Sequence, residues 1–143
     1  MVTVQEIFDA AMDLMDEADE STGSTSTMDT REYRIRTISI LNIVLPVIYP
    51  YSGNYPAASG GKRPRTRMLS ADSRKEPDFE QGIPLDDALS WALLPYYLAS
   101  MLRAGEDMEF SARMMNEYNR AFLEVREKLP AVIEAIPTPY GLF

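Results

Sequence analysis

The chain has no cysteine and no histidine among its 143 residues. The lack of cysteine excludes disulfide bonds and thiolate chemistry, and it is typical of a reducing compartment. The lack of histidine removes the usual general base near neutral pH and the commonest metal-ligating side chain. The many serines therefore have no evident activating base. We expect a protein that is not an enzyme and that uses no cofactor and no metal.

The chain also has no long uninterrupted apolar run. The longest apolar stretch, from Ile38 to Tyr49, is broken by Asn42 and Pro46. It is far shorter than the roughly 20 residues that a membrane-spanning helix needs. The first residues lack the basic region and apolar run of a secretory signal. These absences predict a cytoplasmic protein.

Acidic residues outnumber basic ones, 22 to 14, which gives a net charge of −8. The basic residues are concentrated, because residues 62–75 hold six cations and a single acid, Asp72. That segment is therefore about +5 by formal count, and the rest of the chain is −13. The six cations are Lys62, Arg63, Arg65, Arg67, Arg74 and Lys75.

This basic segment is a candidate contact for DNA or for a protein partner. Clustered cations can neutralise phosphates without reading base sequence. Two other interpretations stay open. The segment could be a solvated loop that pairs with the acids of its own chain, or it could meet the acidic face of another copy.

The first predicted helix follows a capping box at Thr3 and Glu6, with Val2 and Ile7 placed as a hydrophobic staple. Its expected buried face is spaced by three and four residues and comprises Ile7, Ala11, Leu14, Met15 and Ala18. A second cap is expected at Asp29, with Glu32 three residues later. The core positions predicted for this second helix are Ile38, Leu41, Leu45 and Ile48. Pro46 should kink or end it.

The third predicted helix starts at residues 83–87, where acidic residues suit the helix dipole. It is apolar nearly all round from Ala88 to Leu102, so we expect it to be the central, buried helix. Pro95 should kink this helix, and Gly105 should cap its C-terminus. Asp86 and Asp87 are expected to serve this helix start rather than a metal ion.

The fourth predicted helix has an apolar seam that could face the core or a neighbouring chain. The seam comprises Met108, Ser111, Met115, Tyr118, Phe122, Val125 and Leu129. Pro130 should end the helix. Trp91, Tyr96 and Tyr97 could form an aromatic ligand cage, but their helical spacing is more typical of core residues.

Two segments lack helical periodicity. Residues 50–83 hold four prolines and four glycines, and we expect a long irregular arm there, with a short extended element at residues 67–69. Residues 130–143 form an apolar tail with one charged side chain, Glu134. The sequence thus predicts one all-α domain over residues 1–143: a bundle of four main helices, a long irregular central arm and an extended C-terminal tail.

The apolar tail is a candidate for docking on another subunit, because so apolar a segment favours a surface to lie on. The docking candidates are Ile133, Ile136, Tyr140, Leu142 and Phe143. The alternative is that the tail folds back over its own bundle and covers the third helix.

Three stretches carry a resemblance to a known family. They are residues 3–12, residues 31–50, and residues 83–89 with the run Leu-Pro-Tyr-Tyr-Leu-Ala at 94–99. The likeness that they mark extends over most of both helical halves, about two-thirds of the chain, and excludes the central arm. On these stretches the chain resembles the head-tail connector, or adaptor, proteins of tailed bacteriophages and prophages.

The resemblance implies a structural assembly protein that forms a ring between portal and tail. The implied protein partners are other copies of the chain, the portal and tail-completion proteins. Non-specific contact with packaged DNA is a further expectation. The implied location is the host cytoplasm, or the virion if the prophage is active. The alternative is a small nucleic-acid-binding or regulatory helical protein of a prophage. A recognition helix with Arg and Lys at successive faces would favour that alternative, and the sequence shows none.

Overall fold

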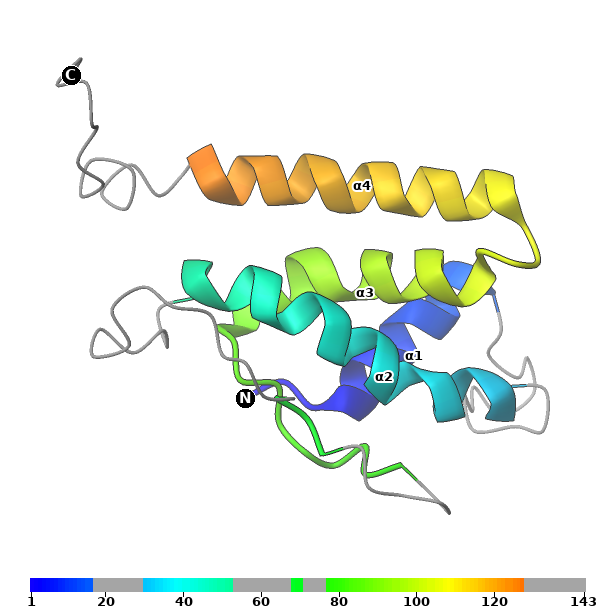
Figure 1. The fold of residues 1–143 in the computed structure, drawn as a ribbon, viewed down its shortest axis with the longest axis horizontal. Helices are drawn as coiled ribbons and strands as arrows, with labels where there is room; N and C mark the ends of the chain where they lie inside the picture. Colours follow the sequence, from blue (N-terminus) through cyan, green and yellow to red (C-terminus); the bar gives the residue numbers. More distant parts are fainter. Residues whose placement is uncertain (17–29, 53–67, 71–76, 128–143) are drawn as a thin grey trace, which may run out of the picture.

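The computed structural model describes residues 1–16, 30–52, 68–70 and 77–127, and these form an all-α fold. The helices are α1 (Val4–Met15), α2 (Arg31–Ile48), α3 (Asp87–Arg103) and α4 (Met108–Glu127), with a 3-10 turn η1 (Tyr49–Tyr51) after α2. The central helix is α3, as expected. In Figure 1, α4 lies along one side of α3, and α1 and α2 lie on the other.

The start of α1 confirms the predicted cap. The Thr3 hydroxyl accepts a hydrogen bond from the Glu6 amide at 3.2 Å, and Val2 and Ile7 are both buried. The Glu6 carboxylate accepts from the Thr3 hydroxyl instead of reaching a backbone amide. The helix ends early, at Met15, with Asp16 in the left-handed conformation. Leu14, expected in the core, is 36% exposed.

The second helix begins with Thr30 at its N-cap, so the expectation of an Asp29 cap is wrong by one residue. Asp29 itself lies outside the described residues. The four predicted core positions of α2 are all buried. Pro46 lies inside α2, which continues to Ile48 before the backbone tightens into η1.

The third helix starts at Asp87, later than expected, because Pro84 and Leu85 belong to the preceding connection. Pro95 lies buried within it. Gly105 does not cap α3 as predicted. Ala104 takes that position in a right-handed conformation, and the amides of Glu106 and Asp107 close the turn on the Arg103 carbonyl.

The seam of α4 faces α3, but it is buried less fully than the sequence indicated. Tyr118 alone among the described residues of α4 is buried, while Met115, Phe122 and Val125 are half-buried against the core. Met108 is 80% exposed and does not join the seam. Ser111 does join it: its hydroxyl donates to the Ser100 carbonyl, and the Ser100 hydroxyl donates to the Ser111 carbonyl. Leu129 and Pro130 lie outside the described residues.

The described parts of the expected arm contain no α-helix, yet several of their side chains are buried in the core. Leu69, Phe79 and Ile83 are at most 3% exposed. Residues 77–83 run beside the N-terminus, where the Phe79 and Gln81 carbonyls accept from the Gln5 and Val4 amides. Leu69 is held by Asn42, whose side chain bonds both its amide and its carbonyl. Met68 and Leu69 form a bend instead of the extended element expected at residues 67–69, and Arg67 lies outside the described residues.

Candidate protein-binding surface

Neither of the two predicted sets of contact residues, the basic segment and the tail, falls in the described part of the chain. The basic segment, with Lys62, Arg63, Arg65, Arg67, Arg74 and Lys75, lies outside it. The docking candidates Ile133, Ile136, Tyr140, Leu142 and Phe143 also lie outside it. The described surface must therefore be considered on its own side chains.

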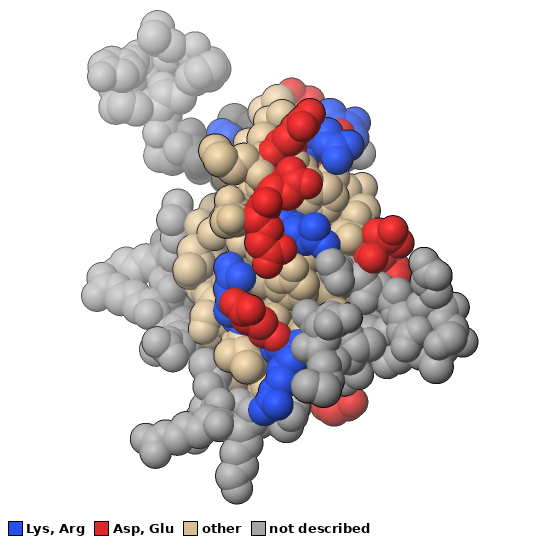
Figure 2. Space-filling model, turned by 90° about the vertical axis from the view of Figure 1, so that its right-hand side faces the viewer, with Lys and Arg blue, Asp and Glu red and all other residues tan. Residues whose placement is uncertain are grey.

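The charge of the described residues is strongly acidic. They hold seven arginines and fifteen acidic residues, so seven minus fifteen gives −8. On the end of the bundle shown in Figure 2, basic side chains are interspersed with acidic ones and do not gather in a separate patch. On this end of the bundle, the arrangement does not offer a DNA backbone a continuous basic surface.

The outer face of α2 carries exposed apolar side chains that the sequence analysis missed. Ile35 is 57% exposed, Ile43 is 63% exposed and Val47 is 37% exposed. With Ser39 they follow a spacing of four, so they lie along one side of the helix. The signal was present in the sequence, because α2 has apolar residues both on its core positions and on this second row.

A groove lies between the C-terminal part of α2 and the C-terminal half of α4, with a volume of about 370 Å³. Its lining residues are Val47, Tyr118, Asn119, Phe122, Leu123 and Arg126. The Phe122 ring packs edge-on against Tyr51 at 5.3 Å between centroids. Leu123 is 54% exposed, so this groove continues the apolar surface that begins on α2.

A second groove, of about 360 Å³, lies between α1 and α3 and is lined by Leu14, Trp91, Pro95 and Tyr96 among others. Trp91 and Tyr96 face α1 here. Tyr97, in contrast, packs on Tyr118 of α4 at 5.2 Å between ring centroids. The three aromatic residues therefore do not form a cage around one point.

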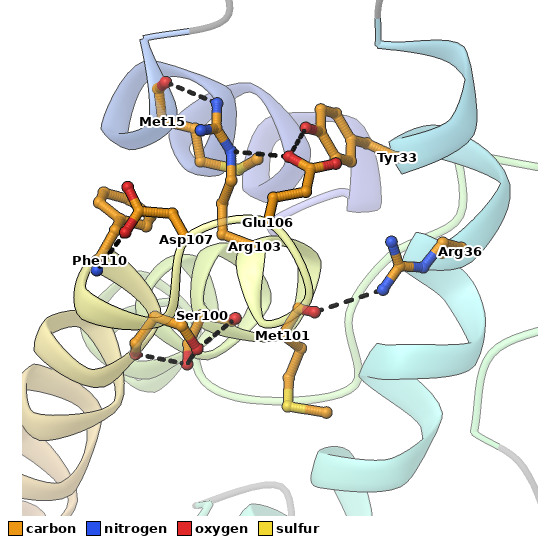
Figure 3. Close-up of polar contacts among 10 residues, drawn as sticks. Met15, Tyr33, Arg36, Ser100, Met101, Arg103, Glu106, Asp107 and Phe110 are labelled. Atoms are coloured by element: carbon orange, nitrogen blue, oxygen red, sulfur yellow. Dashed lines mark hydrogen bonds and ion pairs between the residues drawn. The ribbon is translucent and has the colours of Figure 1, made fainter.

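A group of polar contacts joins the ends of three helices (Figure 3). The Arg103 guanidinium donates to the Met15 carbonyl at 3.2 Å, where a cation suits the C-terminus of α1. The Glu106 carboxylate lies 3.6 Å from Arg103 and accepts from the Tyr33 hydroxyl at 2.6 Å. These groups bond one another, so the arrangement ties α1, α2 and the end of α3 together.

Burial raises the pKa of Tyr118 to about 12, with a smaller contribution from neighbouring Tyr97. Burial also raises the pKa of Tyr97. Both shifts favour the neutral phenol and fit a packing role. Among the described residues no group of acidic side chains could hold a metal ion. The Asp87 carboxylate instead accepts from the Val2 amide at 3.1 Å.

Within the described ranges, no helix has both the length and the apolar character needed to cross a membrane. Comparison of the chain with protein-family models, curated proteins and solved structures gives no match.

Proposed function

We propose that this protein is a structural assembly protein, which acts by binding other protein chains. In the form suggested by the resemblance, it is a head-tail connector that forms a ring between the portal and the tail of a bacteriophage. The observation that carries the proposal is the apolar outer face of α2 with its three exposed side chains, Ile35, Ile43 and Val47. Exposed apolar side chains gathered along one side of a helix typically mark a protein-interaction site.

The apolar tail and the basic segment have places in this proposal. The tail, through residues such as Ile133 and Phe143, is the candidate for docking on another copy or on the portal. The basic segment is the candidate for contact with packaged DNA. The acidic remainder of the protein would then face away from the phosphates, because like charges repel.

The test changes the α2 face without disturbing the core. The double variant Ile35→Asp with Ile43→Asp places two charges on side chains that are more than half exposed, so the free chain should still fold. Burying a large apolar side chain is worth about 1.5–3 kcal/mol. Both side chains are already about two-fifths buried in the free chain, so losing the two should weaken binding to the portal protein about 20-fold or more.

The matched control is Met108→Asp, which adds a charge at an 80%-exposed site away from α2. Binding of each variant to the portal protein is measured by titration calorimetry. The control should bind the portal protein as tightly as the original chain does. If the double variant binds as tightly as the control, the α2 face is not the contact surface.

A further inference from the structure

We propose that, in the free chain, the groove between α2 and α4 is occupied by the chain's own C-terminal segment, residues 131–143. The groove has apolar walls from both helices, with Val47 on one side and Phe122 and Leu123 on the other. The side chain of Val47 is 37% exposed, and that of Leu123 is 54% exposed. Burying these exposed side chains under an apolar segment would be favourable, because it removes apolar surface from water.

The position of the groove indicates which segment covers it. Arg126 lines the groove, and the described part of α4 ends one residue later, at Glu127. The chain continues for sixteen more residues, 128–143. That continuation is rich in apolar residues and holds a single acid, Glu134, which suits a groove with Arg126 on its rim.

The distances allow this segment to return along α4. From Tyr118 to Arg126 the helix rises about 12 Å, at about 1.5 Å per residue. Four extended residues span about 13 Å. A reversal at residues 128–130, where Pro130 cannot continue the helix, would therefore bring residues 131–136 along the whole groove.

The same proximity favours the chain's own segment over that of a second copy. A segment joined to its site by a short connection has a millimolar effective concentration, well above that of another chain in dilute solution. This inference goes beyond the proposed function, because it concerns the chain before assembly. While residues 131–143 occupy the groove, their apolar side chains and those of the groove are buried against each other. A partner protein that binds the segment would have to displace it from the groove.

The experiment uses engineered cysteine pairs, since the chain has no cysteine of its own. Asn119→Cys, on the groove lining, is combined with Ile133→Cys or with Ile136→Cys in the full chain. The matched control pairs the same tail positions with Arg120→Cys, which is the next residue on α4 and does not line the groove. An unseated tail would reach both helix positions at equal rates.

With oxidised glutathione, we expect a disulfide within one chain to form at least about tenfold faster from position 119 than from position 120. Val47→Asp, on the opposite wall, should remove this preference, whereas Ile43→Asp, one turn earlier on α2, should leave it. Equal rates from the two positions would overturn the inference. So would disulfides that form only between chains. Neither outcome bears on portal binding, so this failure is distinct from that of the proposed function.

Discussion

At the scale of single residues, Tyr118 is the one side chain that the described part of α4 buries. It is 8% exposed and lies between the rings of Tyr97 and Phe122. Its phenol is held neutral, because burial raises its pKa from 10 to about 12. This shift links the stability of the protein to alkaline pH.

The raised pKa of Tyr118 predicts that the protein loses stability at alkaline pH. Between about pH 10 and 12 the unfolded chain releases the Tyr118 proton while the folded chain keeps it, so the free energy of unfolding falls as pH rises. The contribution lost should be on the order of 1–3 kcal/mol. Tyr118→Phe keeps the ring and has no proton to lose. Urea unfolding at pH 8 and at pH 11.5 should therefore show a smaller loss in this variant. An equal loss in both proteins would place the alkaline sensitivity elsewhere.

At the scale of the elements, the contact between α2 and Leu69 holds part of the central connection in place. The Asn42 side chain accepts from the Leu69 amide at 2.9 Å and donates to the Leu69 carbonyl at 3.1 Å. Leu69 is 2% exposed, so this contact positions a core residue far from α2 in sequence.

Replacing Asn42 tests how much this contact contributes to stability. Asn42→Ala leaves the backbone groups of Leu69 without their partner, which should cost about 1–3 kcal/mol of stability. Ser39→Ala is the matched control, because Ser39 is exposed on the same helix almost one turn earlier and should change stability by less than about 0.5 kcal/mol. Chemical denaturation of both variants gives the measurement. Equal stabilities would mean that Asn42 does not hold Leu69.

The elements also show what local sequence can and cannot predict. The cap at Thr3 and the core positions Leu41 and Leu45 were predictable, because capping and helical spacing depend on neighbouring residues. The burial of Leu69 and Phe79 was not, because their partners lie far away in the sequence. The outer face of α2 was missed for a related reason: periodicity shows that a helix has two apolar sides, but tertiary packing decides which one is covered.

Helix ends were the least predictable feature. Gly105 was expected to cap α3, yet Ala104 takes that position and Glu106 instead takes part in the contacts around Arg103. The predicted seam of α4 was right at Tyr118 and wrong at Met108, which is 80% exposed although Ser111 in the same turn bonds Ser100 of α3. The candidate residues of the basic segment and the tail stay predictions, because they lie outside the described residues.

At the scale of the whole molecule, the described surface combines an acidic character with three apolar features: the α2 face, the adjoining groove between α2 and α4, and the groove between α1 and α3. The described residues sum to −8, as seven arginines against fifteen acids. Such a surface suits association with proteins through apolar contacts, with charge restricting which surfaces can approach. On this basis we propose that the chain functions through association with other protein chains.

The most direct test of that claim is the molar mass in solution, measured by sedimentation over a wide range of concentrations. It is measured for the chain alone and for a mixture with a phage portal protein. We expect masses above the 16.2 kDa of one chain, either as multiples at high concentration or as co-sedimentation with the portal. A single 16.2 kDa species at every concentration, beside an unchanged portal, would contradict it.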